Sequence, residues 1–160
     1  ETCPVLIPLE DDWELQRPLD LDPLVRTLLA GLDGHAESRE RGFTGEPIRC
    51  IRLGYIGYTG ALRGEFVGTP AGQMILLDPE SPEPHVFAGH ARIETRDFER
   101  SIGPWPEMLP AGEVEFEVAK RHAARRGVAW PLDVVGGSSG LFAHIGTIEY
   151  GEHTPTGGAS

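Results

Sequence analysis

The sequence contains no asparagine and a single lysine, Lys120, among its 14 basic residues. Without asparagine, the chain has no Asn-X-Ser/Thr acceptor for N-linked glycosylation. The excess of arginine over lysine indicates a GC-rich coding sequence and a bacterial-like composition. It is a property of the gene and carries no information about function.

Cysteine is also scarce, and no long apolar run is present. The two cysteines, Cys3 and Cys50, are too few for a disulfide scaffold. Cys50 is expected to be a small buried hydrophobe, and a Cys3–Cys50 disulfide is expected only if the chain is exported. No apolar run approaches the roughly 20 residues that span a bilayer. We therefore expect a cytoplasmic protein. Because the sequence begins at Glu1 and not at a methionine, a removed upstream segment is the alternative.

Positive charge is in the minority. The 25 acidic and 14 basic residues give a formal net charge of −11. A field of that sign repels nucleic acids and anionic membranes, and it favours solubility or a basic protein partner. The acidic run Glu10-Asp11-Asp12 is a candidate docking element for such a partner. The basic cluster Lys120-Arg121-His122 with Arg125-Arg126 is expected to pair with nearby glutamates on a solvated helix face.

Length and composition predict one domain over residues 1–160, with an irregular strap over 1–20 and a frayed tail over 152–160. The 21 glycines and 14 prolines favour short strands joined by many turns. A chain of this length buries enough surface to fold without disulfides or a metal.

The stretch Ile48–Asp78 is the organising element of the predicted fold. Three apolar runs rich in β-branched and aromatic residues are separated by turns that contain glycine and proline, which is typical of a strand meander. The first run is apolar on both faces, so it predicts a central strand. Its glycines predict bends in a curved sheet.

The clearest helix signal is Asp22-Pro23, an N-cap followed by proline at the first helical position, with leucines on one face up to Gly34. The remaining elements are weaker. We expect an edge strand at Val5–Ile7, anchors at Trp13 and Leu15, strands at His85–Thr95, Glu113–Val118 and Leu141–Tyr150, and a helical turn at Asp97–Ile102. We expect a short helix at Lys120–Arg126 after the strand at 113–118, and a helix over the whole of Gly112–Arg126 is the alternative. The fold class is α+β and β-rich: a curved antiparallel sheet or small barrel with one or two helices packed on it.

Candidate catalytic residues come from two predicted strands. His90 and His144 each lie in an apolar stretch, Glu94 shares a strand face with His90, and Tyr150 shares one with His144. If those strands are neighbours, a histidine base oriented by a carboxylate results. No histidine or cysteine spacing matches a metal site, and no motif indicates a cofactor, so neither is expected.

Candidate ligand-binding residues are the aromatic side chains Tyr55, Tyr58, Phe87, Trp105 and Trp130, with Met108 and Phe98 as further lining residues. A strongly curved sheet either fills its concave side or holds a small ligand there. The lead hypothesis is therefore a non-catalytic module that binds a small apolar ligand or a protein partner. The alternative is a small cavity enzyme, an isomerase, cyclase or hydrolase, that uses histidine-based acid/base chemistry.

Overall fold

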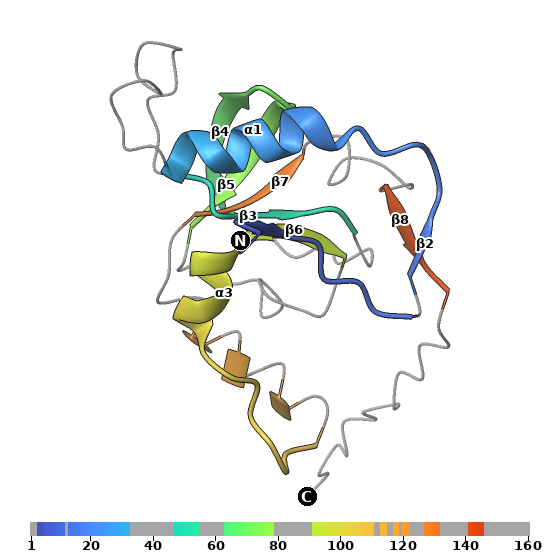
Figure 1. The fold of residues 1–160 in the computed structure, drawn as a ribbon, viewed down its shortest axis with the longest axis vertical. Helices are drawn as coiled ribbons and strands as arrows, with labels where there is room; N and C mark the ends of the chain where they lie inside the picture. The colour runs from blue at the N-terminus through green and yellow to red at the C-terminus, as the bar shows by residue number, and fades with distance from the viewer. Residues whose placement is uncertain are drawn as a thin grey trace, which may run out of the picture.

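The structure is a computed structural model of the chain (Figure 1). The described residues are 3–11, 13–32, 47–54, 63–78, 91–110, 113–114, 117–118, 120–121, 127–131 and 141–145. The predicted strand at His85–Thr95 is therefore described only from Ala91 onward, and the predicted tail lies outside these residues.

The described elements confirm an α+β fold with more strand than helix. In chain order they are β1 (Val5–Leu6), β2 (Trp13–Leu15), α1 (Leu21–Leu32), β3 (Cys50–Arg52), β4 (Gly64–Thr69), β5 (Gly72–Leu77), β6 (Arg92–Thr95), α3 (Arg96–Ile102), β7 (Val128–Pro131) and β8 (Phe142–His144). Strands β2 and β7 are additions to the predicted set.

Six strands form the main sheet in the order β1-β6-β3-β7-β5-β4. Within the described residues this sheet is open, with β1 and β4 at its edges. The expectation of a wholly antiparallel sheet is wrong at one place, because β3 and β7 are parallel. Between β3 and β7 the chain passes through β4, β5, β6 and α3. A long connection of this kind can place two strands in parallel.

Strand β3 is central, as predicted, and both of its faces are buried. It lies between β6 and β7. Ile51 and Leu53 have no solvent exposure on one side, and Cys50 has none on the other. The apolar run therefore reflects a strand that is covered on both faces.

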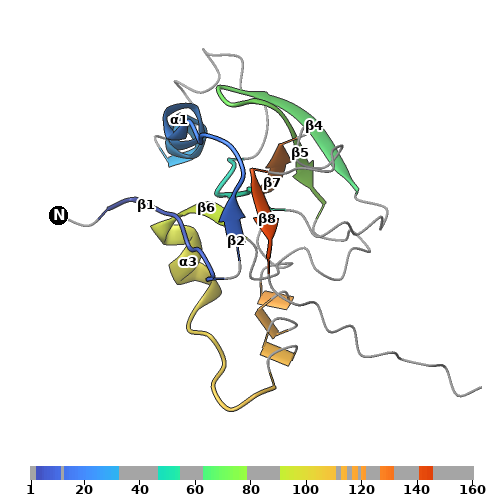
Figure 2. The same ribbon diagram turned by 90° about the vertical axis from the view of Figure 1, so that its right-hand side faces the viewer.

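Helix α1 covers one face of the sheet, and α3 lies on the opposite face (Figures 1 and 2). Leu24 and Leu28 of α1 are buried in the same core cluster as Ile51 and Ile93. Burying each such side chain contributes roughly 1.5–3 kcal/mol, so packing holds this helix in place.

The predicted N-cap of α1 is off by two residues. The Oδ1 atom of Asp20, not Asp22, accepts a hydrogen bond from the helix start, donated by the Asp22 backbone N–H at 3.2 Å. Asp22 instead lies in the first turn and pairs with Arg26 at 2.5 Å. Both acidic residues are suited to the positive end of a helix, so the local signal was correct but its register was not.

The β4–β5 hairpin corresponds to the second and third apolar runs of the predicted meander. Its turn at residues 69–72 is stabilised by the Thr69 hydroxyl, which donates to the Gly72 carbonyl at 2.8 Å and accepts from the Ala71 N–H at 3.1 Å. Gly72 adopts a φ of 105°, a conformation that favours glycine. The turn residues thus favour this connection through local hydrogen bonds and the conformation of Gly72.

Strands β2 and β8 form a second, two-stranded sheet at one end of the molecule (Figure 1). Trp13 is the buried anchor that was predicted, whereas Leu15 is 47% exposed and does not anchor the segment. Trp13 lies directly over Gly54, where an added Cβ would be 2.5 Å from a Trp13 ring carbon. A glycine is thus required where β3 ends under this ring.

The predicted strand at Glu113–Val118 is wrong at the residues that can be assessed. Residues 113–114, 117–118 and 120–121 are helical, in agreement with the alternative. The N–H groups of Glu113 and Val114 both donate to the Pro110 carbonyl. Alternating glutamates suit an exposed strand only if a neighbouring strand supplies backbone partners, and here the partners are local.

Candidate functional site

Two of the predicted site residues, Glu94 and Trp105, line one pocket. This pocket has a volume of about 380 Å³ and lies between β6, α3 and the segment that follows α3. Its lining residues are Arg92, Glu94, Glu99, Arg100, Ile102, Gly103, Pro104 and Trp105. It combines four charged side chains with an apolar wall.

The floor of the pocket is formed by the face of the sheet that α3 covers. Arg92 and Glu94 are two residues apart on β6 and so point to the same side. Across the strand pair, Arg52 lies opposite Arg92, and Cys50 lies opposite Glu94. All four side chains are buried, which gives this β3–β6 face an unusually polar interior for a small protein.

A buried ion pair joins the two floor residues. The Nε atom of Arg92 donates to Oε2 of Glu94 at 3.1 Å, and the side chains are only 8% and 1% exposed. Burial raises the pKa of Glu94; Arg92 opposes this shift by its charge and hydrogen bond, and the charge of Glu99 adds to it. Desolvation therefore outweighs the attraction of the arginine.

The neighbouring thiol is chemically inert. Burial raises the pKa of Cys50 to about 12, and the charge of Glu94 adds to the shift. Since the thiolate is the reactive form of cysteine, Cys50 is a structural residue, as predicted. Both cysteines are free, with Cys3 exposed and Cys50 buried, so the conditional disulfide is not formed.

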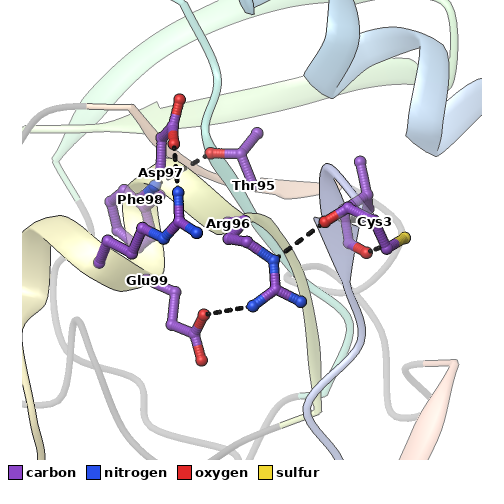
Figure 3. Close-up of polar contacts among 8 residues, drawn as sticks. Cys3, Thr95, Arg96, Asp97, Phe98 and Glu99 are labelled. Carbon is purple, nitrogen blue, oxygen red and sulfur yellow. Dashed lines mark hydrogen bonds and ion pairs between the residues drawn. The ribbon is translucent and has the colours of Figure 1, made fainter. Parts of the chain in front are cut away.

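Helix α3 supplies one wall of the pocket and is held firmly at its start (Figure 3). The Thr95 hydroxyl caps it by accepting from the Phe98 N–H at 3.2 Å. Arg96 donates from Nε to the Cys3 carbonyl at 3.0 Å and approaches Glu99 at 3.9 Å. The contact with Cys3 ties α3 to the segment that leads into β1, and the contact of Arg96 with Glu99 orients Glu99.

The apolar wall follows the C-terminus of α3, where Gly103 adopts a φ of 80°. Arg121 donates to the carbonyls of Ile102 at 3.3 Å and Pro104 at 2.5 Å. The predicted basic cluster is therefore partly structural. Lys120 pairs with Glu117 as expected, whereas Arg121 holds the wall in place.

Several predicted site residues stay untested. Tyr55, Tyr58, Phe87, His90 and Tyr150 lie outside the described residues, and only the backbone of Trp130 and His144 is described. His144 lies on β8 opposite Trp13, whereas β6 pairs with β1 and β3.

Two further predicted lining residues, Phe98 and Met108, do not line this pocket. Phe98 is fully buried in the core, and Met108 is 99% exposed outside the pocket. Conversely, no pattern in the sequence predicted a role in a site for Glu99, Arg100, Ile102 and Pro104. The pattern that could have identified them is the direct succession of a charged strand, a short charged helix and Gly-Pro-Trp-Pro. This succession brings charged and apolar side chains close together in the fold.

A pH experiment tests the environment of Glu94. Because the folded state holds the proton of Glu94 more tightly than the unfolded chain does, the contribution of Glu94 to stability should fall as pH rises. The fall begins near the ordinary glutamate value of about 4.3 and ends above the raised folded pKa. Urea unfolding of the wild type and Glu94→Gln across this range should give a stability difference that decreases with pH. A difference that grows with pH would contradict the raised pKa.

No group of three or more His, Cys, Asp or Glu side chains in the described ranges is placed to hold a metal ion. Within the same ranges, no helix has the length and apolar character needed to cross a membrane. Comparisons with protein-family models, with curated proteins and with solved structures gave no match to this chain.

Proposed function

We propose that this protein is a non-catalytic module that binds a small molecule in the β6–α3 pocket. The pocket volume of about 380 Å³ is in the range typical of small-molecule sites, roughly 300–1,000 Å³. Such sites combine apolar walls with a few polar groups that orient the ligand, and both are present here. The apolar part of the ligand contacts Ile102, Pro104 and Trp105, and its polar part faces the charged side chains.

Trp105 is the observation on which the proposal rests. Its side chain lines the pocket and is 45% exposed, although tryptophan is usually well buried. It lies between two prolines, and Arg121 holds the backbone just before it. Both features reduce the conformational freedom of this wall. A large apolar surface held in place before binding loses little entropy when a ligand covers it.

Replacing Trp105 with alanine should weaken binding by about tenfold or more, because roughly half the area of a large aromatic side chain is lost from the contact. The wild type is first screened against small aromatic and aliphatic fragments by ligand-observed NMR. Dissociation constants of the bound fragments are then compared for the wild type and Trp105→Ala. Circular dichroism should show an unchanged fold, since the side chain is not part of the core.

Phe66→Ala is the matched control, since Phe66 is an aromatic residue on β4 that is 68% exposed and does not line the pocket. It should leave fragment affinities unchanged. Equal losses in the two variants, or no bound fragment at all, would contradict the proposal. A protein partner that contacts the exposed Met108 and Leu109 would then be the remaining form of the binding hypothesis.

An acid/base enzyme is the second candidate, favoured by the raised pKa of the pocket residue Glu94. Carboxyl groups with such shifts are common among catalytic acids and bases. Glu94→Gln keeps the shape of the side chain but cannot transfer a proton. If the protein turns over a bound fragment, this variant should abolish turnover while binding persists. His90, His144 and Tyr150 stay predictions of the same hypothesis.

A further inference from the structure

We propose that the polar group of the ligand is a cation, such as the ammonium group of an arylalkylamine. This inference rests on the proposed function, because it names the chemical class that the same pocket selects. It follows from a comparison of the charges around the pocket with the aromatic surface of its wall and with the charge of the whole chain.

The charged lining residues cancel one another. Two arginines, Arg92 and Arg100, and two glutamates, Glu94 and Glu99, line the pocket. Arg92 is paired with Glu94 at 3.1 Å, whereas Arg100 and Glu99 make only long pairs, at 3.7 Å with Asp97 and 3.9 Å with Arg96. The formal charge of the lining is zero. Weaker effects must then decide between a cation and an anion.

Trp105 is the first of these effects. The face of an indole ring carries partial negative charge and attracts cations within about 6 Å of its centre. Trp105 lines the pocket beside Pro104, and its half-exposed side chain is accessible to a ligand. An anion placed against the face of the ring would be repelled by it. A ring face that contacts the ligand would therefore favour an ammonium group over a carboxylate.

The second effect is the field of the whole protein. A formal net charge of −11 raises the local concentration of cations and lowers that of anions. Glu99 also favours a cation. It is a pocket carboxylate whose side chain is 49% exposed, and its distance to Arg96 is a long 3.9 Å. A ligand cation can approach this carboxylate without displacing a close ion pair.

Three probes of equal length test the inference: 3-phenylpropylamine, 3-phenylpropan-1-ol and 3-phenylpropanoate. Their dissociation constants are measured by ligand-observed NMR near neutral pH and at low salt. We expect the amine to bind about threefold to tenfold more tightly than the alcohol, and the alcohol more tightly than the carboxylate. Added salt should weaken binding of the amine more than that of the alcohol.

Glu99→Gln is the diagnostic variant, because its side chain is half-exposed and makes only a long pair, at 3.9 Å, with Arg96. It should weaken binding of the amine about threefold and leave the alcohol unchanged. Glu65→Gln on the exposed strand β4 removes the same charge far from the pocket lining and should change neither by a comparable amount. Equal losses in the two variants would overturn the role of Glu99.

The possible failures are distinguishable. If the carboxylate or the alcohol binds at least as tightly as the amine, and Trp105→Ala weakens it, the cationic class is overturned while the proposed pocket stands. If none of the three probes binds even in the millimolar range, the proposed function fails and the inference fails with it.

Discussion

Replacing Glu94 with alanine should lower the free energy of unfolding by about 3–5 kcal/mol, because the Arg92 guanidinium would stay buried without this carboxylate. The two side chains are 8% and 1% exposed and 3.1 Å apart. The intact pair itself adds little net stability, since burial of Glu94 opposes its charged form. The large loss comes from breaking the pair. Urea unfolding monitored by circular dichroism measures it.

Two variants distinguish a broken pair from a general effect of charge. The double variant Arg92→Met/Glu94→Leu removes both charges and should be more stable than Glu94→Ala, because no partner is left buried without its opposite charge. Arg26→Ala breaks the exposed pair with Asp22 on α1 and should cost far less. A loss in Glu94→Ala no greater than that in Arg26→Ala would contradict the buried-pair account.

Gly127→Ala should destabilise the fold by at least about 3 kcal/mol, for two reasons that act together. Gly127 adopts a φ of 101°, which alanine tolerates poorly, and an added Cβ would lie 2.5 Å from the carbonyl oxygen of Pro47. The Gly127 carbonyl accepts hydrogen bonds from Arg49 at 2.7 Å and Cys50 at 3.0 Å. The backbone on both sides is thus fixed, and the added methyl group has no room.

Gly68→Ala on β4 is the matched control for this experiment. No atom lies within 4 Å of the position of its added Cβ. Its effect should be within about 0.5 kcal/mol of zero, as for other surface substitutions. Chemical denaturation of both variants gives the comparison. A loss for Gly127→Ala as small as that for Gly68→Ala would show that the β3–β7 junction can move apart without cost.

Secondary-structure elements that depend on neighbouring residues were predictable from the sequence. The turn at residues 69–72 carries its own hydrogen-bonding threonine and a glycine with positive φ, so the β4–β5 hairpin follows from a few adjacent residues. Helix α1 follows from a capping region and a leucine face, with an error of two residues in the cap. The two-faced apolar run correctly placed β3 at the centre, because burial on both faces excludes polar alternation.

The candidate site was only half predictable. Glu94 and Trp105 stand out as a carboxylate in an apolar strand and a tryptophan between prolines. Glu99 and Arg100 look like ordinary solvated residues of a short helix, because the direction of a helix relative to a sheet is not encoded in its own charges. Their role in the pocket depends on the contacts of Arg96 and Arg121 with backbone carbonyls elsewhere in the chain.

By itself the sequence determined the fold class, the central strand, the hairpin and two of the residues that line the pocket, since each depends on neighbouring residues or on hydrophobic periodicity. Only the tertiary structure decided the parallel β3–β7 pair, the β2–β8 sheet and the helical state of the described residues within 113–118. These three features depend on backbone partners far away in the sequence or on a competition between local and distant hydrogen bonds. A periodic pattern records which side chains are buried, but it does not record which strand supplies the partner.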